Sequence, residues 1–102
     1  MTIFTLQCIH VIRSFKHRGL KRFYERGDPR GIRPDLLDRV DDILGRLDQA
    51  ETPLAMNLPG YRLHKLTGDL KGFWSVTVTA NRRIIFRFED ADAFDVELID
   101  YH

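Results

Sequence analysis

Apolar and polar residues alternate through most of residues 61–88. A repeat of two residues is typical of strands that bury one face and expose the other. We predict two such strands joined by a turn over residues 80–82, with Arg83 and Arg87 on the polar side. Together with His64, these arginines are expected to share one exposed face of a small antiparallel sheet. The predicted buried side consists of Trp74, Val76, Val78, Ile84, Phe86 and Phe88.

Two amphipathic helices are predicted before these strands. Residues 17–26 carry apolar side chains at intervals of three and four, and Gly27 is placed to end the helix. The second helix begins at Pro34, because proline is favoured at the first helical position, and it runs to about Gln49. Its apolar stripe consists of Leu36, Leu37, Val40, Ile43, Leu44 and Leu47.

Two further strands complete the predicted fold. Residues 11–15 fit a short strand in which Ile12 and Phe15 contribute to the core. Residues 94–99 alternate again and fit a last strand, while residues 52–60 contain two prolines and fit a connecting loop. We therefore predict an α+β fold, a small single domain with two helices packed on one face of an antiparallel or mixed β-sheet.

Length and composition narrow the class of protein. A chain of 102 residues is expected to form one domain, and a hydrophobic fraction of 43% is typical of folded proteins. Cys8 is the only cysteine, so it cannot form an internal disulfide, and it has no metal-ligand spacing with nearby histidines. Residues 1–10 lack the basic start of a signal peptide and are too short to span a bilayer. We expect a cytoplasmic protein with no membrane association and no metal.

Charge is sorted into blocks along the chain, although the net charge is only +1. Residues 13–33 and 62–87 are basic, whereas residues 35–51 and 89–102 are acidic. Two basic blocks that meet in space would attract a phosphate backbone. Charge blocks are also typical of ordinary solvated faces, so charge alone does not decide the ligand.

Several residues have side chains suited to cutting RNA without a metal. His64 and His102 can each donate or accept a proton near neutral pH. Arg83 and Arg87 can hold a phosphate and stabilise negative charge as it develops, and Tyr101 can stack on a base. Together they provide a base for a ribose 2′-hydroxyl, a cation for the five-coordinate phosphorus and an acid for the leaving oxygen.

Each of these residues also has a simpler interpretation. A single histidine on a sheet is commonly just an exposed residue, and a terminal residue such as His102 can be frayed. The strand arginines can be paired with neighbouring carboxylates such as Asp95 or Glu97. Spacing alone therefore leaves catalysis and simple surface roles both open.

Five ordered segments resemble a known family. They read IRSFKHRGLK at residues 12–21, LPGYRLH at 58–64, GFWSV at 72–76, NRRI at 81–84 and DYH at 100–102. In these segments the chain resembles the HigB-type toxins of bacterial type II toxin-antitoxin modules, within the RelE-like superfamily. The resemblance implies a ribosome-dependent endoribonuclease that cuts mRNA without a cofactor. It also implies a cognate HigA-like antitoxin with a helix-turn-helix domain.

The resemblance places catalytic roles on three residues. His64 falls on the family's strand histidine, Arg83 on its arginine and His102 on its terminal histidine. It implies that one histidine acts as general base and the other as acid, with the assignment open, while Arg83 stabilises the transition state. The residues expected to bind RNA are Lys65, Lys71, Arg82, Arg87 and Tyr101.

The chain departs from the family pattern at two places. Thr67 stands where family members often have a lysine that contributes to the site, so either Lys65, Lys71 or Arg87 supplies a cation or the protein is a slower nuclease. Residues 1–10 precede the usual family start, which we interpret as an extension, or a mis-assigned start, before a toxin domain over residues 11–102. The alternative is that they form a real first strand.

Two other functions remain open at this point. The basic sheet could belong to a non-catalytic or attenuated module that binds RNA or the ribosome and is regulated by an antitoxin. A purely structural protein, or one that sequesters the antitoxin, would show no ribosome association at all.

Overall fold

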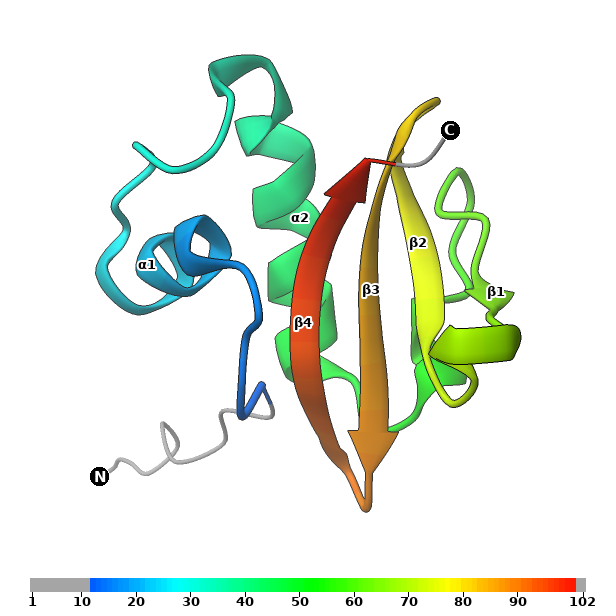
Figure 1. Cartoon of the computed structure of the whole chain (residues 1–102). Coiled ribbons are helices and arrows are strands. Elements are labelled where there is room, and N and C mark those ends of the chain that lie inside the picture. The colour runs from blue at the N-terminus through cyan, green and yellow to red at the C-terminus, as the bar shows by residue number, and fades with distance from the viewer. Residues whose placement is uncertain (1–11, 101–102) are drawn as a thin grey trace.

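A computed structural model describes residues 12–100 of the chain. The main helices are α1 (Arg18–Arg26) and α2 (Leu37–Gln49), and short 3₁₀ turns η2, η3 and η4 lie in the connections. The strands form one antiparallel sheet in the order β1-β2-β3-β4 (Figure 1). They are β1 (His64–Lys65), β2 (Trp74–Thr79), β3 (Arg82–Glu89) and β4 (Asp92–Asp100), and the 3₁₀ turns are η2 (Pro34–Leu36), η3 (Pro53–Met56) and η4 (Gly68–Leu70).

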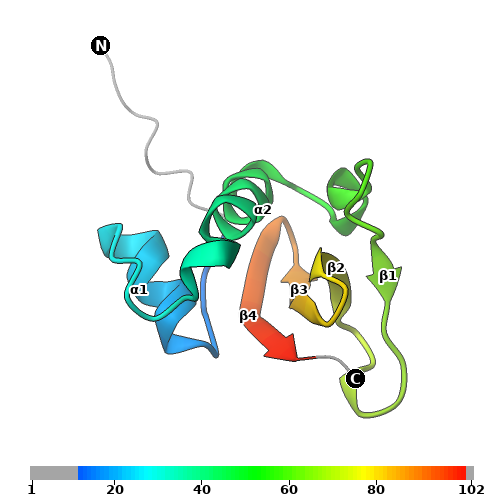
Figure 2. The same cartoon turned by 90° about the horizontal axis from the view of Figure 1, so that it is seen from above.

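The two helices occupy different positions around the sheet. Helix α2 covers one face, while α1 lies beside the β4 edge (Figure 2). The segment before α1 runs parallel to β4 through bridges from Ile12 to Ala93 and from Phe15 to Val96. The predicted α+β fold is therefore confirmed, with an antiparallel sheet. The predicted strand over residues 11–15 is present in the described chain only as these two isolated bridges, and α1 flanks the sheet edge instead of sharing the face that α2 covers (Figure 2).

Local chemistry explains where α1 begins and ends. The His17 ring nitrogen Nδ1 accepts a hydrogen bond from the Leu20 N–H at 3.1 Å, which caps the first turn. Gly27 has a φ of 70° in the left-handed region and donates its N–H to the Phe23 carbonyl. The predicted end of this helix at Gly27 is confirmed.

The core lies between α2 and the sheet. The α2 stripe meets the strand side chains that alternation placed on the buried side, and Val40, Ile43, Leu47, Val76, Ile84 and Phe86 are each fully buried. Trp74 and Phe88 pack against this cluster from its margin. The hydrophobic period therefore identified the face of the sheet that packs on the helix.

Two details of the strands differ from the predicted pattern. Arg82, predicted within the turn, already belongs to β3 and pairs with both Thr79 and Asp100. In β4, Asp95 has a φ of 55° and the register shifts beside it. This bulge interrupts the alternation, so Phe94 does not belong to the core cluster. Its ring lies under the Arg87 guanidinium instead, with 5.0 Å between the ring centre and Arg87 Cζ.

Within the described residues, no helix has the length and apolar character needed to cross a membrane. The predicted extension over residues 1–10 lies outside this part of the chain, as do Tyr101 and His102.

Candidate functional site

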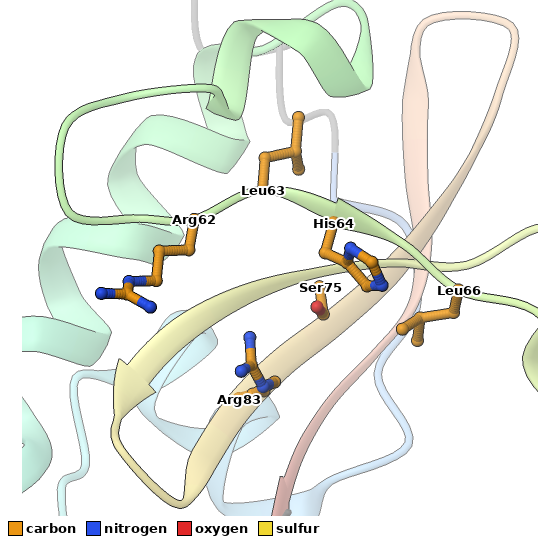
Figure 3. Close-up of a pocket in the computed structure, with 6 residues that line it drawn as sticks. All are labelled: Arg62, Leu63, His64, Leu66, Ser75 and Arg83. Carbon is orange, nitrogen blue, oxygen red and sulfur yellow. The ribbon is translucent and has the colours of Figure 1, made fainter.

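A groove of about 460 Å³ opens on the side of the sheet away from α2, which we call the open face. Strands β1, β2 and β3 each contribute to it, and its apolar walls come from two leucines (Figure 3). The residues that line the groove are Arg62, Leu63, His64, Leu66, Ser75 and Arg83. The groove therefore combines one imidazole with two guanidinium groups, and none of these lining residues is acidic.

Strand register brings His64 and Arg83 into this groove. His64 lies opposite Ser75 in the β1–β2 pair, and Arg83 lies opposite Thr77 in the β2–β3 pair. Residues opposite each other in antiparallel strands project from the same face, so His64, Ser75, Thr77 and Arg83 share the open face. Arg83 Nη1 donates to Thr77 Oγ1 at 3.1 Å, which orients the half-buried guanidinium.

The other predicted RNA-binding residues have different environments. Lys65 lies on the opposite side of β1 from His64, with its Nζ 5.7 Å from the centre of the Trp74 ring. Lys71 is exposed after η4, and Arg82 is half-buried at the start of β3. None of these three lines the groove. His102 and Tyr101 lie outside the described residues, so their predicted roles stay predictions.

Arg87 is engaged by two carboxylates at the other end of β3. Its Nε donates to Asp95 Oδ2 at 2.8 Å, and Nη1 donates to Glu89. The hydrogen bond from Arg87 lowers the pKa of the Asp95 carboxyl below its ordinary value. Of the simpler interpretations, pairing of Arg87 with Asp95 is therefore present in the structure.

The sequence predictions did not include two polar residues of the groove, Ser75 and Arg62, or its two leucines. Ser75 is 1% exposed, and its hydroxyl has no hydrogen-bond partner within residues 12–100. Arg62 has a φ of 51°, in the left-handed region that residues other than glycine rarely adopt. Alternation alone placed Ser75 on the polar side of its strand, but no local signal set Arg62 apart from the other basic residues nearby.

The loop that leads into the groove is held by polar contacts of Tyr61 and Arg39. Tyr61 is 3% exposed and donates its hydroxyl to Asp42, while its carbonyl accepts from the Thr77 N–H at 2.7 Å. Arg39 lies over the Tyr61 ring and donates to the carbonyls of Gly60 and Thr77 at 2.7 and 2.9 Å. Burial and the bond to Asp42 raise the pKa of Tyr61 to about 12.

The groove is equipped for acid-base and electrostatic chemistry on a phosphate. An exposed imidazole can exchange a proton, and guanidinium groups bind phosphate oxygens through parallel N–H donors. Within residues 12–100, no group of three histidine, cysteine or acidic side chains is arranged to hold a metal ion.

Comparison with known proteins identifies the family. Residues 13–102 match the family described as the RelE-like toxin of the type II toxin-antitoxin system HigB. The chain belongs to the HigB-like toxin family. The match covers both helices, all four strands and every residue of the groove.

Individual relatives agree with this assignment. The HigB-like chain is 44% identical over 92 residues to Endoribonuclease HigB of Proteus vulgaris, covering 90% of this chain and all of that protein. It is 34% identical to Toxin HigB-1 of Vibrio cholerae, covering 83% of this chain and 92% of the other. The crystal structure of YafQ from Escherichia coli shares the fold with a TM-score of 0.59 at 15% identity, over 87% of this chain and 90% of YafQ.

Proposed function

We propose that this HigB-like toxin is an endoribonuclease that cleaves mRNA on the ribosome and thereby inhibits translation. The observation that carries the proposal is the groove that His64 of β1 and Arg83 of β3 both line, one on each side of β2. Its 44% identity to Endoribonuclease HigB of Proteus vulgaris supports the same reaction class. As a toxin of a type II system, the protein has an antitoxin partner.

The proposed reaction is an attack within the RNA strand. The ribose 2′-oxygen bonds to the adjacent phosphorus and loses its proton to a general base, while the bond from phosphorus to the 5′-oxygen breaks. A general acid protonates that oxygen, which leaves a 2′,3′-cyclic phosphate and a 5′-hydroxyl. His64 and His102 supply the base and the acid, in either order, and Arg83 stabilises the charge on phosphorus.

The ribosome has a physical role in this proposal. A small groove with few side chains cannot by itself hold an extended RNA strand in reactive geometry. The ribosome presents the codon in a fixed conformation, which lowers the entropic cost of ordering the strand. Lys71, Arg82 and Tyr101 are further RNA contacts in this proposal. The antitoxin is a HigA-like protein with a helix-turn-helix domain, and the toxin acts in the cytoplasm.

An attenuated or non-catalytic RNA-binding module is the second candidate. It is favoured by Thr67, which cannot supply the positive charge of the lysine that the family resemblance leads us to expect. Thr67 also does not line the groove. Under this alternative the toxin would bind the ribosome and leave mRNA intact.

Two arginines of β3 provide a matched test. Arg83→Gln removes one of the two guanidinium groups from the groove, whereas Arg87→Gln removes one at the other end of the same strand, where it is paired with Asp95. We expect Arg83→Gln to lower ribosome-dependent cleavage by about 10²–10³-fold, as for loss of one transition-state donor. Arg87→Gln should retain most of the activity.

The readout is the 5′ ends of mRNA in cells and the cleavage rate on programmed ribosomes. His64→Ala and His102→Ala should abolish new 5′ ends while ribosome co-sedimentation is kept. Intact mRNA with the wild-type toxin bound to ribosomes would favour the non-catalytic module. If Arg83→Gln and Arg87→Gln lose the same amount of cleavage activity, Arg87 also belongs to the RNA-binding site.

A further inference from the structure

We infer that Arg62 is a further substrate-binding residue, whose guanidinium holds an RNA phosphate next to the one that is cleaved. This inference deepens the proposed nuclease function and rests on it. Arg62 is absent from the residues that the sequence pointed to, yet it lines the groove with His64 and Arg83.

The position of Arg62 connects two hollows of the molecular surface. Beside the first groove lies a second one of about 370 Å³, lined by Arg62, Thr77, Ala80 and Arg83. Arg62 and Arg83 belong to both grooves and come from different segments of the chain (Figure 3). An RNA backbone that passes from one groove to the other would run between the two guanidinium groups. No acidic residue lines either groove within the described chain, so nothing there opposes a phosphate.

The backbone at Arg62 is strained in a way that calls for an explanation. Its φ of 51° is one that glycine or asparagine adopts more readily than arginine. Glycine occurs two residues earlier, at position 60, where φ is 82°. Strained residues persist where the surrounding structure holds them, and they gather at binding and active sites. Arginine at this position therefore indicates that its side chain is needed.

The surrounding contacts hold Arg62 in place. The preceding residue, Tyr61, is held by three features. Its ring is buried, its hydroxyl donates to Asp42, and its carbonyl accepts from the Thr77 N–H. The following strand begins at His64, which pairs with Ser75. A guanidinium attached to such an anchored backbone loses less conformational entropy on binding an anion than a guanidinium on a flexible loop.

Arg62 also accounts for a positive charge that the sequence left unassigned. Thr67 stands where a lysine is expected, and the replacements considered were Lys65, Lys71 and Arg87. Lys65 lies over Trp74, Arg87 is paired with Asp95 and Glu89, and Lys71 lines neither groove. Arg62 is exposed, lines the groove and has no ion pair with any residue of the described chain. It is therefore the better placed cation.

Three variants of Arg62 separate charge from backbone strain. Arg62→Gln removes the charge and keeps the strained backbone, Arg62→Asn removes the charge and relieves the strain, and Arg62→Lys keeps a charge. Arg26→Gln is the matched control, because Arg26 is an exposed arginine in the last turn of α1, outside both grooves. Cleavage of mRNA on programmed ribosomes is measured against toxin concentration and salt, together with the melting temperature and ribosome co-sedimentation.

We expect Arg62→Gln and Arg62→Asn to raise the half-saturating concentration for cleavage by about tenfold or more, as for loss of a charged hydrogen bond. The salt dependence should weaken by about 0.7 in log-log slope, the contribution of one single-stranded phosphate contact. Arg62→Asn should melt no lower than the wild type, so its loss of activity is not a loss of folding. Arg62→Lys should lie closer to wild type than Arg62→Gln, and Arg26→Gln should behave as wild type.

Different outcomes overturn different statements. Wild-type kinetics in both Arg62→Gln and Arg62→Asn would overturn the role of Arg62 and leave the nuclease intact. An equal loss in Arg62→Lys and Arg62→Gln would overturn the charge as the cause. A matching loss of ribosome co-sedimentation would place Arg62 on ribosomal RNA instead of the substrate. Absence of cleavage by the wild type, or full activity of Arg83→Gln, would instead overturn the proposed function itself.

Discussion

The two faces of the sheet are built on different physical terms. On the face covered by α2, Val76, Ile84 and Phe86 are completely buried against the α2 stripe. On the open face the same strands present Ser75 and Arg83, with an unpaired hydroxyl on the serine within residues 12–100 and a half-buried guanidinium. One face gains free energy from apolar burial, and the other retains groups that are unfavourable for folding.

This contrast teaches where stability and function are separated. Each strand alternates, so one residue contributes to the core and the next is free for chemistry. Two unfavourable features line the groove at one end of the open face, the strained backbone of Arg62 and the Ser75 hydroxyl, which has no partner within residues 12–100. At the other end, Arg87 is paired with Asp95, so an arginine of the same strand has a structural role there. Changes on the two faces should therefore affect stability in opposite directions.

The largest effect is expected from Phe86→Ala on the covered face. The ring is fully buried and meets Phe88 edge-on, with 5.8 Å between ring centres. Truncation leaves a cavity that the strands cannot close, so the free energy of unfolding should fall by about 3–5 kcal/mol. Chemical denaturation followed by circular dichroism measures the loss.

Thr79→Ala is the control for this variant, because Thr79 is exposed at the end of β2. Its unfolding free energy should stay within about 0.5 kcal/mol of wild type. A loss below 1 kcal/mol in Phe86→Ala, on the order of a surface change, would mean that the covered face is not the main source of stability.

The contrast between the faces also explains how far the sequence was informative. Alternation in β2 and β3 and the α2 stripe correctly divided core from open face, because burial of a periodic pattern decides register. Register then placed His64 and Arg83 together. The bulge at Asp95 and the left-handed backbone at Arg62 were missed, since both depend on tertiary contacts and neither residue is a glycine. The pairing of Arg87 with Asp95 was considered from the sequence, but only the fold selects between the nearby carboxylates.

A smaller effect is expected from Tyr61→Phe, at the boundary between the two faces. The variant removes the hydroxyl that donates to Asp42, so the free energy of unfolding should fall by about 1 kcal/mol near neutral pH. The pKa of Tyr61 is raised to about 12 from an ordinary value of 10.0, chiefly by burial. Its stabilising contribution is therefore complete below pH 10 and is lost as the pH rises through 12.

Urea denaturation at several pH values tests this assignment. The wild type should lose stability steeply between pH 10 and 12, and Tyr61→Phe should lose less over the same range. Tyr24 also has a raised pKa, caused first by burial, and this contribution is unchanged in the variant. Identical alkaline curves for the two proteins would assign the whole transition to groups other than Tyr61.

The smallest effect, and the one with the opposite sign, is expected from Ser75→Ala on the open face. The hydroxyl is buried without a partner in the described chain, so its removal abolishes a desolvation penalty and leaves the packing nearly unchanged. We expect the free energy of unfolding to rise by up to about 1 kcal/mol.

Val76→Ala is the matched comparison, since Val76 is the next residue of β2 and points into the core. That variant should lose about 2 kcal/mol. Opposite signs at adjacent positions would sharpen the division between the faces, whereas a destabilised Ser75→Ala would show that the open face also contributes to the stability of the fold.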